Sequence, residues 1–288
     1  MCNYKIQFWV PLFNFFTHKD KIEIGDKFVI EKPTSFEKKN IIERLARGVE
    51  DIISSEYLLR TYIKTNKPAE NTIEFFDKAI IDFKKAIILF RLFKEKYIGF
   101  KFIIKPLSNT LKYEYCIENL SYSTIDSKKL KGRYIINNDE IELLNKFFRE
   151  YDIFSTSSFD LAVSNFNRSY SQYFQINEFL DIMFVLENLF LRNTNQELKY
   201  KLSMRMAYVL GANDNTKRED IFTFIQKCYD IRSQIVHSDK FPKLDIERIS
   251  KLREYTIDSI KIFFKNKDLC SGKNLDDIIL KGNFNLNN

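Results

Sequence analysis

The fold of the C-terminal half is decided by the stretch Tyr229-Asp230-Ile231-Arg232-Ser233-Gln234-Ile235-Val236-His237-Ser238. It closes a segment in which apolar residues recur at steps of three and four, the period of one face of an α-helix. These residues are Ile221, Phe224, Ile225, Cys228, Ile231 and Ile235. Pro242 follows shortly after and cannot continue the pattern, because proline has no amide hydrogen. The spacing therefore predicts a helix over 218–237, with His237 at the end where the helix dipole favours an imidazolium.

Arg232 and His237 are the side chains of this helix that could act on an anionic substrate. On a regular helix, at about 100° per residue, they would lie about 140° apart and would not stack on one face. They can converge through irregular geometry at the helix end, or by facing the same pair on a second copy of the chain. In the structural alternative, His237 caps carbonyl groups beside a surface arginine.

An arginine, four intervening residues and a histidine at a helix end resemble the motif of the HEPN superfamily. The surrounding residues 229–237 are most similar to the Apea-like branch, and the upstream segment Leu186-Glu187-Asn188-Leu189-Phe190 fits the same branch. The resemblance covers roughly residues 135–268. It implies an all-helical domain that homodimerises and cleaves RNA without a metal, as in prokaryotic antiphage defence, abortive infection and toxin systems.

The resemblance assigns the catalytic roles to Arg232, which would hold the scissile phosphate, and to His237, the acid or base. Two such pairs in a symmetric dimer would supply both proton-transfer roles. Many active members carry Asn, Asp or His directly after the arginine, whereas this chain has Ser233. We expect Ser233 and Gln234 to support the phosphate by hydrogen bonding.

Glu187 and Arg205 are both flanked by apolar residues at helical spacing, so each needs a partner of opposite charge. Glu187 and Arg205 are therefore expected as supporting residues, and two pairings remain open. A Glu187–Arg205 pair would orient the bundle, whereas Glu187 paired with Arg232 would serve the site.

Two functions of other classes compete with the nuclease. The helical domain could bind RNA, a nucleotide or a partner protein without turnover, or it could serve only as a structural dimerisation unit. A regulatory partner or a phage-derived trigger is a further expected partner.

Length, composition and charge limit the classes of protein to which the chain can belong. The chain has 288 residues, 44% hydrophobic and 30% charged, with a net charge of +7 and a pI of about 9.0, which is compatible with a polyanionic partner. The cysteines have no zinc-ligand spacing and no Asp/Glu pair has the spacing of a two-metal site, so neither a metal nor any other cofactor is expected. No Gly-x-Ser-x-Gly elbow is present, which argues against a Ser–His–Asp hydrolase. An apolar run over 8–16 is too short to span a membrane, and we expect it to form a buried strand of a cytoplasmic protein.

The N-terminal region, residues 1–125, is predicted to be α+β and to sense a trigger or restrain activity. Strands are expected over 5–30 with a turn at Gly25-Asp26, over 98–104 and over 112–117. Helices are expected over 35–62 and 70–90. The polar stretch 119–132 is the expected boundary.

The remainder is predicted to be an all-α, HEPN-like bundle over 133–270, so that the whole chain is mostly helical. Six helices are expected, beginning with one over 141–148. Gly211 is expected to provide a left-handed C-cap. Residues 271–288 are expected to be a C-terminal tail.

Overall fold

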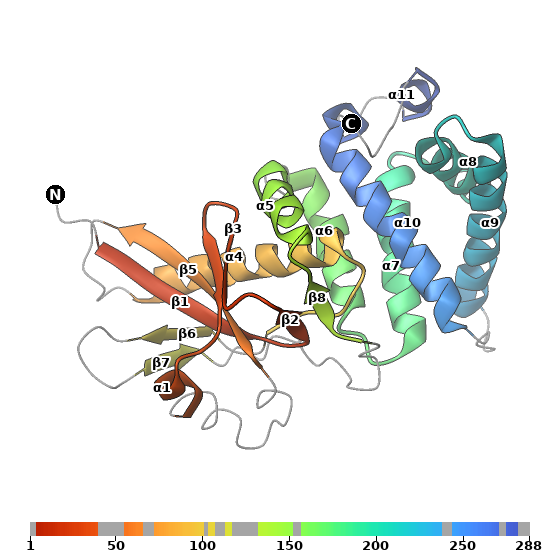
Figure 1. Ribbon diagram of the computed structural model, residues 1–288. Coiled ribbons are helices and arrows are strands. Elements are labelled where there is room, and N and C mark those ends of the chain that lie inside the picture. The colour runs from red at the N-terminus through yellow and green to blue at the C-terminus, as the bar shows by residue number, and fades with distance from the viewer. Residues whose placement is uncertain are drawn as a thin grey trace. The chain divides into compact units, whose positions relative to one another are not determined.

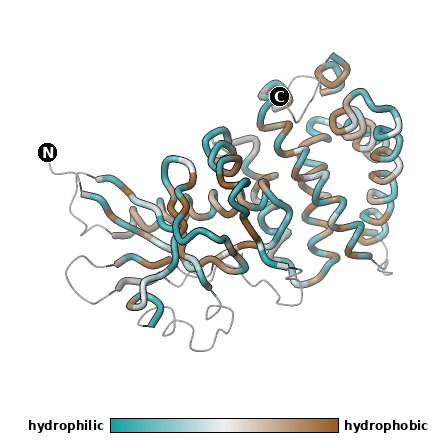
Figure 2. Tube along the Cα trace, in the orientation of Figure 1, coloured by the Kyte–Doolittle hydropathy of each residue, from teal (hydrophilic) through white to brown (hydrophobic). Residues whose placement is uncertain are grey.

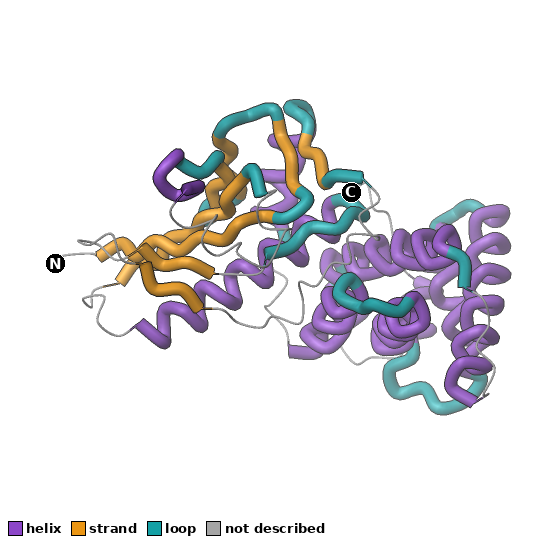
Figure 3. The backbone as a smooth tube through the Cα atoms, turned by 90° about the horizontal axis from the view of Figure 1, so that it is seen from below, coloured by secondary structure: helices purple, strands orange, loops and turns teal. Residues whose placement is uncertain are grey.

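The computed structural model describes residues 4–39, 55–65, 72–100, 103–106, 113–116, 132–151, 157–237, 244–270 and 275–281. The chain divides into two compact units, Met1–Asp152 and Ile153–Asn288 (Figure 1). Figure 3 shows that the described strands all belong to the first unit, as the α+β prediction requires. No helix in the described ranges is both long and apolar enough to cross a membrane.

The first unit is built on a six-stranded antiparallel sheet of order β3-β4-β5-β1-β6-β7. The strands are β1 (Tyr4–Leu12), β3 (Lys21–Ile24), β4 (Phe28–Glu31), β5 (Tyr57–Thr65), β6 (Ile103–Pro106) and β7 (Tyr113–Cys116). A turn at Gly25, with φ of 56°, joins β3 to β4 as predicted. The run at 8–16 is buried and largely strand, as expected, but it is divided between β1, which ends at Leu12, and β2, which begins at Phe15 after Asn14 with its φ of 60°.

Helix α4 (Thr72–Phe93) covers one face of this sheet. Phe8 of β1 meets Phe76 edge to face at 5.2 Å, and Phe28 of β4 lies 6.4 Å from Phe83 between ring centroids. The alternation of buried and exposed residues along β3 is what a half-buried strand requires. The helix predicted over 70–90 is thereby confirmed.

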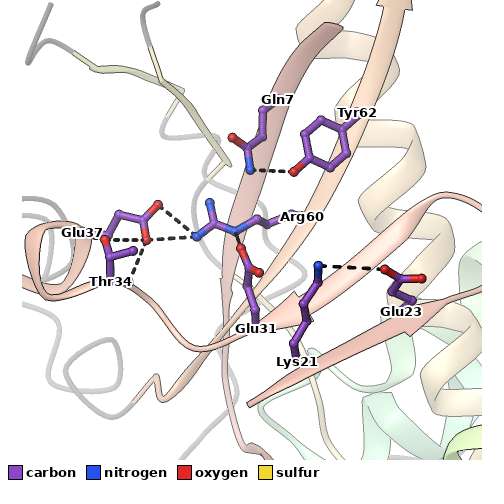
Figure 4. A network of polar contacts seen from close by, with 8 residues as sticks. All are labelled: Gln7, Lys21, Glu23, Glu31, Thr34, Glu37, Arg60 and Tyr62. Atoms are coloured by element: carbon purple, nitrogen blue, oxygen red, sulfur yellow. Dashed lines mark hydrogen bonds and ion pairs between the residues drawn. The ribbon is translucent and has the colours of Figure 1, made fainter. Parts of the chain in front are cut away.

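The opposite face of the sheet carries a buried cation, Arg60 of β5 (Figure 4). Its Nε lies 2.5 Å from Glu31 Oε1, its Nη2 lies 2.9 Å from both oxygens of Glu37, and its guanidinium lies 5.6 Å from the Trp9 ring centre. Glu37 ends the short helix α1 (Ser35–Glu37) and also completes a capping box with Thr34. Arg60 therefore ties α1 to the sheet through Glu37 and also joins β5 to β4 through Glu31.

The helix predicted over 35–62 is wrong at its C-terminal end, because residues 57–62 lie in β5, between β1 and β4. The aromatic and β-branched residues there pack well on a sheet, and pairing on both sides satisfies the backbone. Residues 40–54 of that expected helix lie outside the described residues.

The boundary between the units lies later than the predicted one, part of which falls outside the described residues. Strand β8 (Tyr134–Ile136) pairs in parallel with β2 (Phe15–Thr17), and α5 (Glu140–Glu150) belongs to the first unit. Phe148 of α5 packs on Phe90 at 5.0 Å, and Gly25 N–H donates to Asn145 Oδ1 at 2.8 Å. Helix α5, which the sequence predicts as the first helix of the bundle, therefore packs its apolar face against α4 in the first unit.

The second unit is helical. Its elements are α6 (Ser157–Ser169), α7 (Gln175–Phe190), α8 (Leu198–Gly211), α9 (Asn215–His237), α10 (Ile246–Lys265), the 3-10 turn η3 (Lys267–Cys270) and α11 (Leu275–Lys281). Hydrophobic and hydrophilic residues alternate along these helices (Figure 2). Helix α7 packs against α6, α8, α9 and α10 and buries most of its apolar residues. Arg253 of α10 pairs with Glu178 of α7 and lies over the Tyr170 ring, all three buried.

The structure departs from the expected bundle at two places. Residues 275–281 of the expected tail form α11, which packs on α8. Gly211 is the last residue of α8, and the positive φ of 46° falls on Ala212 instead. Gly211 is required for a different reason, because a Cβ there would lie 2.5 Å from Arg218 Cγ.

Candidate functional site

Helix α9 carries Arg232 and His237 and remains α-helical to His237. Ile221, Ile225, Cys228 and Ile235 are buried, so the predicted apolar stripe is the face packed into the unit. Helix α9 packs against α7 and α8. It also touches α10, where Phe224 meets Tyr255 edge to face. This packing decides which side chains of the helix reach solvent.

Arg232 lies at the edge of the buried face and is held by Glu187 of α7. Arg232 Nε lies 2.9 Å from Glu187 Oε1, and Nη2 donates to Oε2 at 3.2 Å. The exposed fractions of the two side chains are 27% and 19%, so the pair is largely shielded from water. Of the two pairings left open by the sequence, the structure contains Glu187–Arg232.

The contact with Glu187 leaves one side of the guanidinium available. Arginine has five N–H donors; Nη2 donates one hydrogen to Glu187 Oε2, while Nε lies at ion-pair distance from Oε1. Within the described residues, Nη1 has no acceptor. Arg232 is thus fixed in direction while it keeps donors for an incoming anion.

Tyr229 lies beside this pair, with the guanidinium carbon 6.0 Å from its ring centre. Burial raises the pKa of the Tyr229 hydroxyl, and the Glu187 carboxylate nearby raises it further. The hydroxyl therefore stays protonated at neutral pH and acts as a hydrogen-bond donor, not as a base.

His237 is exposed at the last residue of α9. Because α9 is regular up to this residue, the angular separation from Arg232 remains about 140° on the helix surface. Up to residue 237, the irregular helix end that would bring the two together within one chain is not present. The segment 238–243, with the predicted break at Pro242, lies outside the described residues.

Of the expected supporting residues, Ser233 lies about 100° around the helix from Arg232, between it and His237, whereas Gln234 lies at about 200°, beyond His237. Ser233 is half-buried and Gln234 is exposed, and neither has a hydrogen-bonding partner for its side chain in the described part of the chain. Asp230 is paired with Lys199 of α8, whose Nζ lies 2.7 Å from both carboxylate oxygens. Sequence reasoning missed Lys199, because the contact joins two helices whose register only the fold reveals.

Arg205 lies outside the candidate site, although the sequence suggested it as a supporting residue. It is 4% exposed, and it donates from Nε and Nη2 to the two oxygens of Asp276 at 2.6 and 2.9 Å. Nη1 donates to Phe190 O at 2.5 Å and to Thr194 Oγ1 at 3.1 Å. The Glu187–Arg205 alternative is wrong, because Asp276 of α11 binds Arg205 and Glu187 is paired with Arg232.

Among the described residues, neither the buried Cys228 nor a cluster of metal-binding side chains gives a second candidate site. Cys228 is fully buried, and burial raises the pKa of its thiol to about 12, so it is not a nucleophile at neutral pH. Among the described residues, no group of three or more His, Cys, Asp or Glu could hold a metal ion.

Comparisons with family models, with curated proteins and with solved structures found no match for this chain.

Proposed function

We propose that the chain is a metal-independent endoribonuclease that acts as a homodimer, with Arg232 and His237 at its site. The observation that carries this is the Glu187–Arg232 contact at 2.9 Å, on a regular helix that ends in an exposed histidine. A carboxylate beside a guanidinium that retains free donors suits a positioned phosphate clamp. The resemblance to the HEPN superfamily supports the same assignment.

Arg232 would bind the scissile phosphate through Nη1 and the remaining hydrogen of Nη2. Glu187 offsets part of the positive charge, which weakens the ground-state attraction for phosphate. It also fixes the plane of the guanidinium, so that the donors are already aimed when negative charge builds up on the phosphorane.

His237 would exchange the protons. As a neutral imidazole it takes the proton of the ribose 2′-hydroxyl, whose oxygen attacks phosphorus while the bond from phosphorus to the 5′-oxygen breaks. An imidazolium gives a proton to the leaving 5′-oxygen. The products are a 2′,3′-cyclic phosphate and a 5′-hydroxyl, with no electrons gained or lost.

A dimer would supply both the two histidines that the reaction needs and an approach of His237 to Arg232. One histidine cannot be both protonated and unprotonated in a single step, and Arg232 and His237 of one regular helix point in different directions. Around a two-fold axis, the histidine of one copy can approach the arginine of the other, and the second histidine supplies the second role.

We further propose a role in antiphage defence or a toxin-like stress response, with the sheet-containing unit as the sensing or restraining part. This part of the proposal rests on the family resemblance and on the division into two units.

RNA binding without turnover is the second candidate. Its support is the same Glu187 contact, because a neutralised and anchored arginine also suits a recognition site where no chemistry follows.

The testing experiment compares wild type, Arg232→Ala and Arg133→Ala for cleavage of single-stranded RNA in EDTA. Arg133 is the control, since it is an exposed arginine of the first unit paired with Glu56. We expect Arg232→Ala to lose about 10²–10³ in rate, the usual effect of removing one donor to developing charge, and Arg133→Ala to match wild type. Equal rates for Arg232→Ala and wild type would refute the assignment, and RNA binding without cleavage by wild type would favour the second candidate.

A further inference from the structure

On the side of helix α9 that bears Arg232 and His237, basic, aromatic and hydroxyl side chains are interspersed with Glu219, Gln226 and Val236. At about 100° per residue, Arg218, Tyr229, Phe222 and Ser233 lie about 40°, 60°, 80° and 100° around the helix from Arg232, in the direction of His237. We call this set the α9 strip: Arg218, Phe222, Tyr229, Arg232, Ser233 and His237. It extends about 28 Å along the helix axis, at about 1.5 Å per residue.

An aromatic pair lies on the strip where α8 meets α9. The rings of Tyr200 and Phe222 are 5.9 Å apart and meet edge to face at 78°. Phe222 thereby supports one side of Tyr200, yet 54% of Tyr200 remains exposed. A ring needed only for packing between the helices would be more fully covered, so Tyr200 offers a supported stacking surface to solvent.

Arg218 is a second side chain held in place by its neighbours, at the N-terminal end of the α9 strip. Its stem lies against Gly211, where there is no room for a Cβ, and its guanidinium carbon lies 4.4 Å from the ring centre of Tyr208. In the described part of the chain, no carboxylate pairs with Arg218. A guanidinium that lies over an aromatic ring, has its stem held against Gly211 and lacks a carboxylate is suited to a phosphate or a base edge.

From these contacts we infer that the α9 strip, with Tyr200 and Tyr208 of α8, is the path along which single-stranded RNA reaches the site. This rests on the proposed function and adds the substrate class to it. Arg218 binds a backbone phosphate, and Tyr200 stacks on an unpaired base. Arg232 and His237 act about 15 Å and 22 Å from Phe222 along the axis, a separation of several nucleotides.

The same geometry excludes duplex RNA as the preferred ligand. In an A-form helix the base faces are stacked on each other, so the exposed ring of Tyr200 would have no base to contact.

Two acidic residues lie near the α9 strip. The charge of Asp230, at the edge of the strip, is compensated by Lys199. Glu219 is exposed next to Arg218 and, among the described residues, has no cationic partner, so it opposes phosphate binding.

The experiment measures fluorescence anisotropy of the full-length protein with a labelled single strand of about twelve nucleotides, within the range of known single-strand sites. Its 2′-hydroxyls are methylated, so that cleavage cannot occur. The variants are Tyr200→Ala, Arg218→Gln and Glu219→Gln. Tyr173→Ala and Lys227→Gln are the matched controls, since Tyr173 is exposed outside the strip and Lys227 lies on the other side of α9. A duplex of the same sequence is titrated in parallel.

We expect Tyr200→Ala to weaken binding about tenfold, the loss of one stacked base. Arg218→Gln should weaken it about fivefold and reduce the slope of log affinity against log salt by about one. Glu219→Gln should tighten binding, the controls should match wild type, and the duplex should bind more weakly than the single strand.

The inference is overturned if Tyr200→Ala and Arg218→Gln bind like wild type, if the duplex binds equally well, or if wild type does not bind. Self-association that Tyr200→Ala abolishes in the absence of RNA would also overturn it, since the ring would then belong to a protein interface. Because the methylated strand cannot be cleaved, failure of the path is separate from failure of the nuclease, which the EDTA assay detects.

Discussion

In the proposed mechanism, the guanidinium of Arg232 must stay available to phosphate and yet keep one orientation beside the protein. Glu187 holds the guanidinium in one orientation by binding only one side of it. It also compensates part of the positive charge, which weakens the attraction of Arg232 for phosphate. A carboxylate that orients a functional side chain in this way is typically worth 10–100-fold in activity.

Replacing Glu187 tests this positioning role. We expect Glu187→Gln to lower kcat about tenfold without raising KM for RNA, because Arg232 gains net positive charge but loses its fixed orientation. Steady-state kinetics provide the measurement, with Glu254→Gln, an exposed position of α10, as control. An unchanged kcat, or a rise in KM alone, would contradict the positioning role.

Asp276 makes a pH-dependent contribution to stability. The hydrogen bond from Arg205 lowers the pKa of this carboxyl below its ordinary value. The contact is therefore fully stabilising above the ordinary pKa of an aspartate, about 3.9, and is lost as the pH falls through the lower folded value.

Asp276→Asn should cost about 1–3 kcal/mol in the free energy of unfolding at pH 7, because Arg205 is left buried without its ion. Urea titrations at pH 7 and near pH 3 should show the difference from wild type shrinking at the acidic pH. The exposed neighbour Asp277 serves as control through Asp277→Asn. A difference that does not depend on pH would mean that the ion pair is not the cause.

At the scale of elements, the turn between α8 and α9 brings Arg218 close to the end of α8. Gly211 permits this approach, and Ala212 takes a φ of 46° and a ψ of −118°, a conformation that a side chain disfavours.

Two substitutions at this turn should have opposite effects. Gly211→Ala should lower the free energy of unfolding by about 1–3 kcal/mol, since the new Cβ meets Arg218 atoms at 2.5 and 3.1 Å. Ala212→Gly should raise it by about 1 kcal/mol by relieving backbone strain. Denaturant titration of both variants is the check, and destabilisation by Ala212→Gly would contradict the strain.

The period of the hydrophobic pattern predicts correctly the helices and strands that bury a single face. Helix α9 and the β3–β4 hairpin are confirmed by the structure, because each repeats one spacing over its length and ends at a recognisable break. Residues 57–62 were assigned to the wrong element, since apolar runs buried on both faces carry no alternation. The partner choices of Glu187 and Arg205 depended on Asp276, which is distant in sequence and lies in a short helix.

At the scale of the whole molecule, the proposed mechanism needs two copies of the chain, because each copy offers a single His237 at the end of a regular α9. His18, the other histidine of the chain, lies on the first unit, exposed beside Phe16. The central claim therefore depends on His237 alone among the histidines.

The most direct measurement is end-group analysis of RNA cleaved in EDTA by wild type, His237→Ala and His18→Ala, each first shown to be folded and to have the oligomeric state of wild type. We predict 2′,3′-cyclic phosphate and 5′-hydroxyl ends for wild type and His18→Ala, and a loss of about 10²–10⁴ in rate for His237→Ala. Equal cleavage by His237→Ala, or products with other ends, would contradict the account.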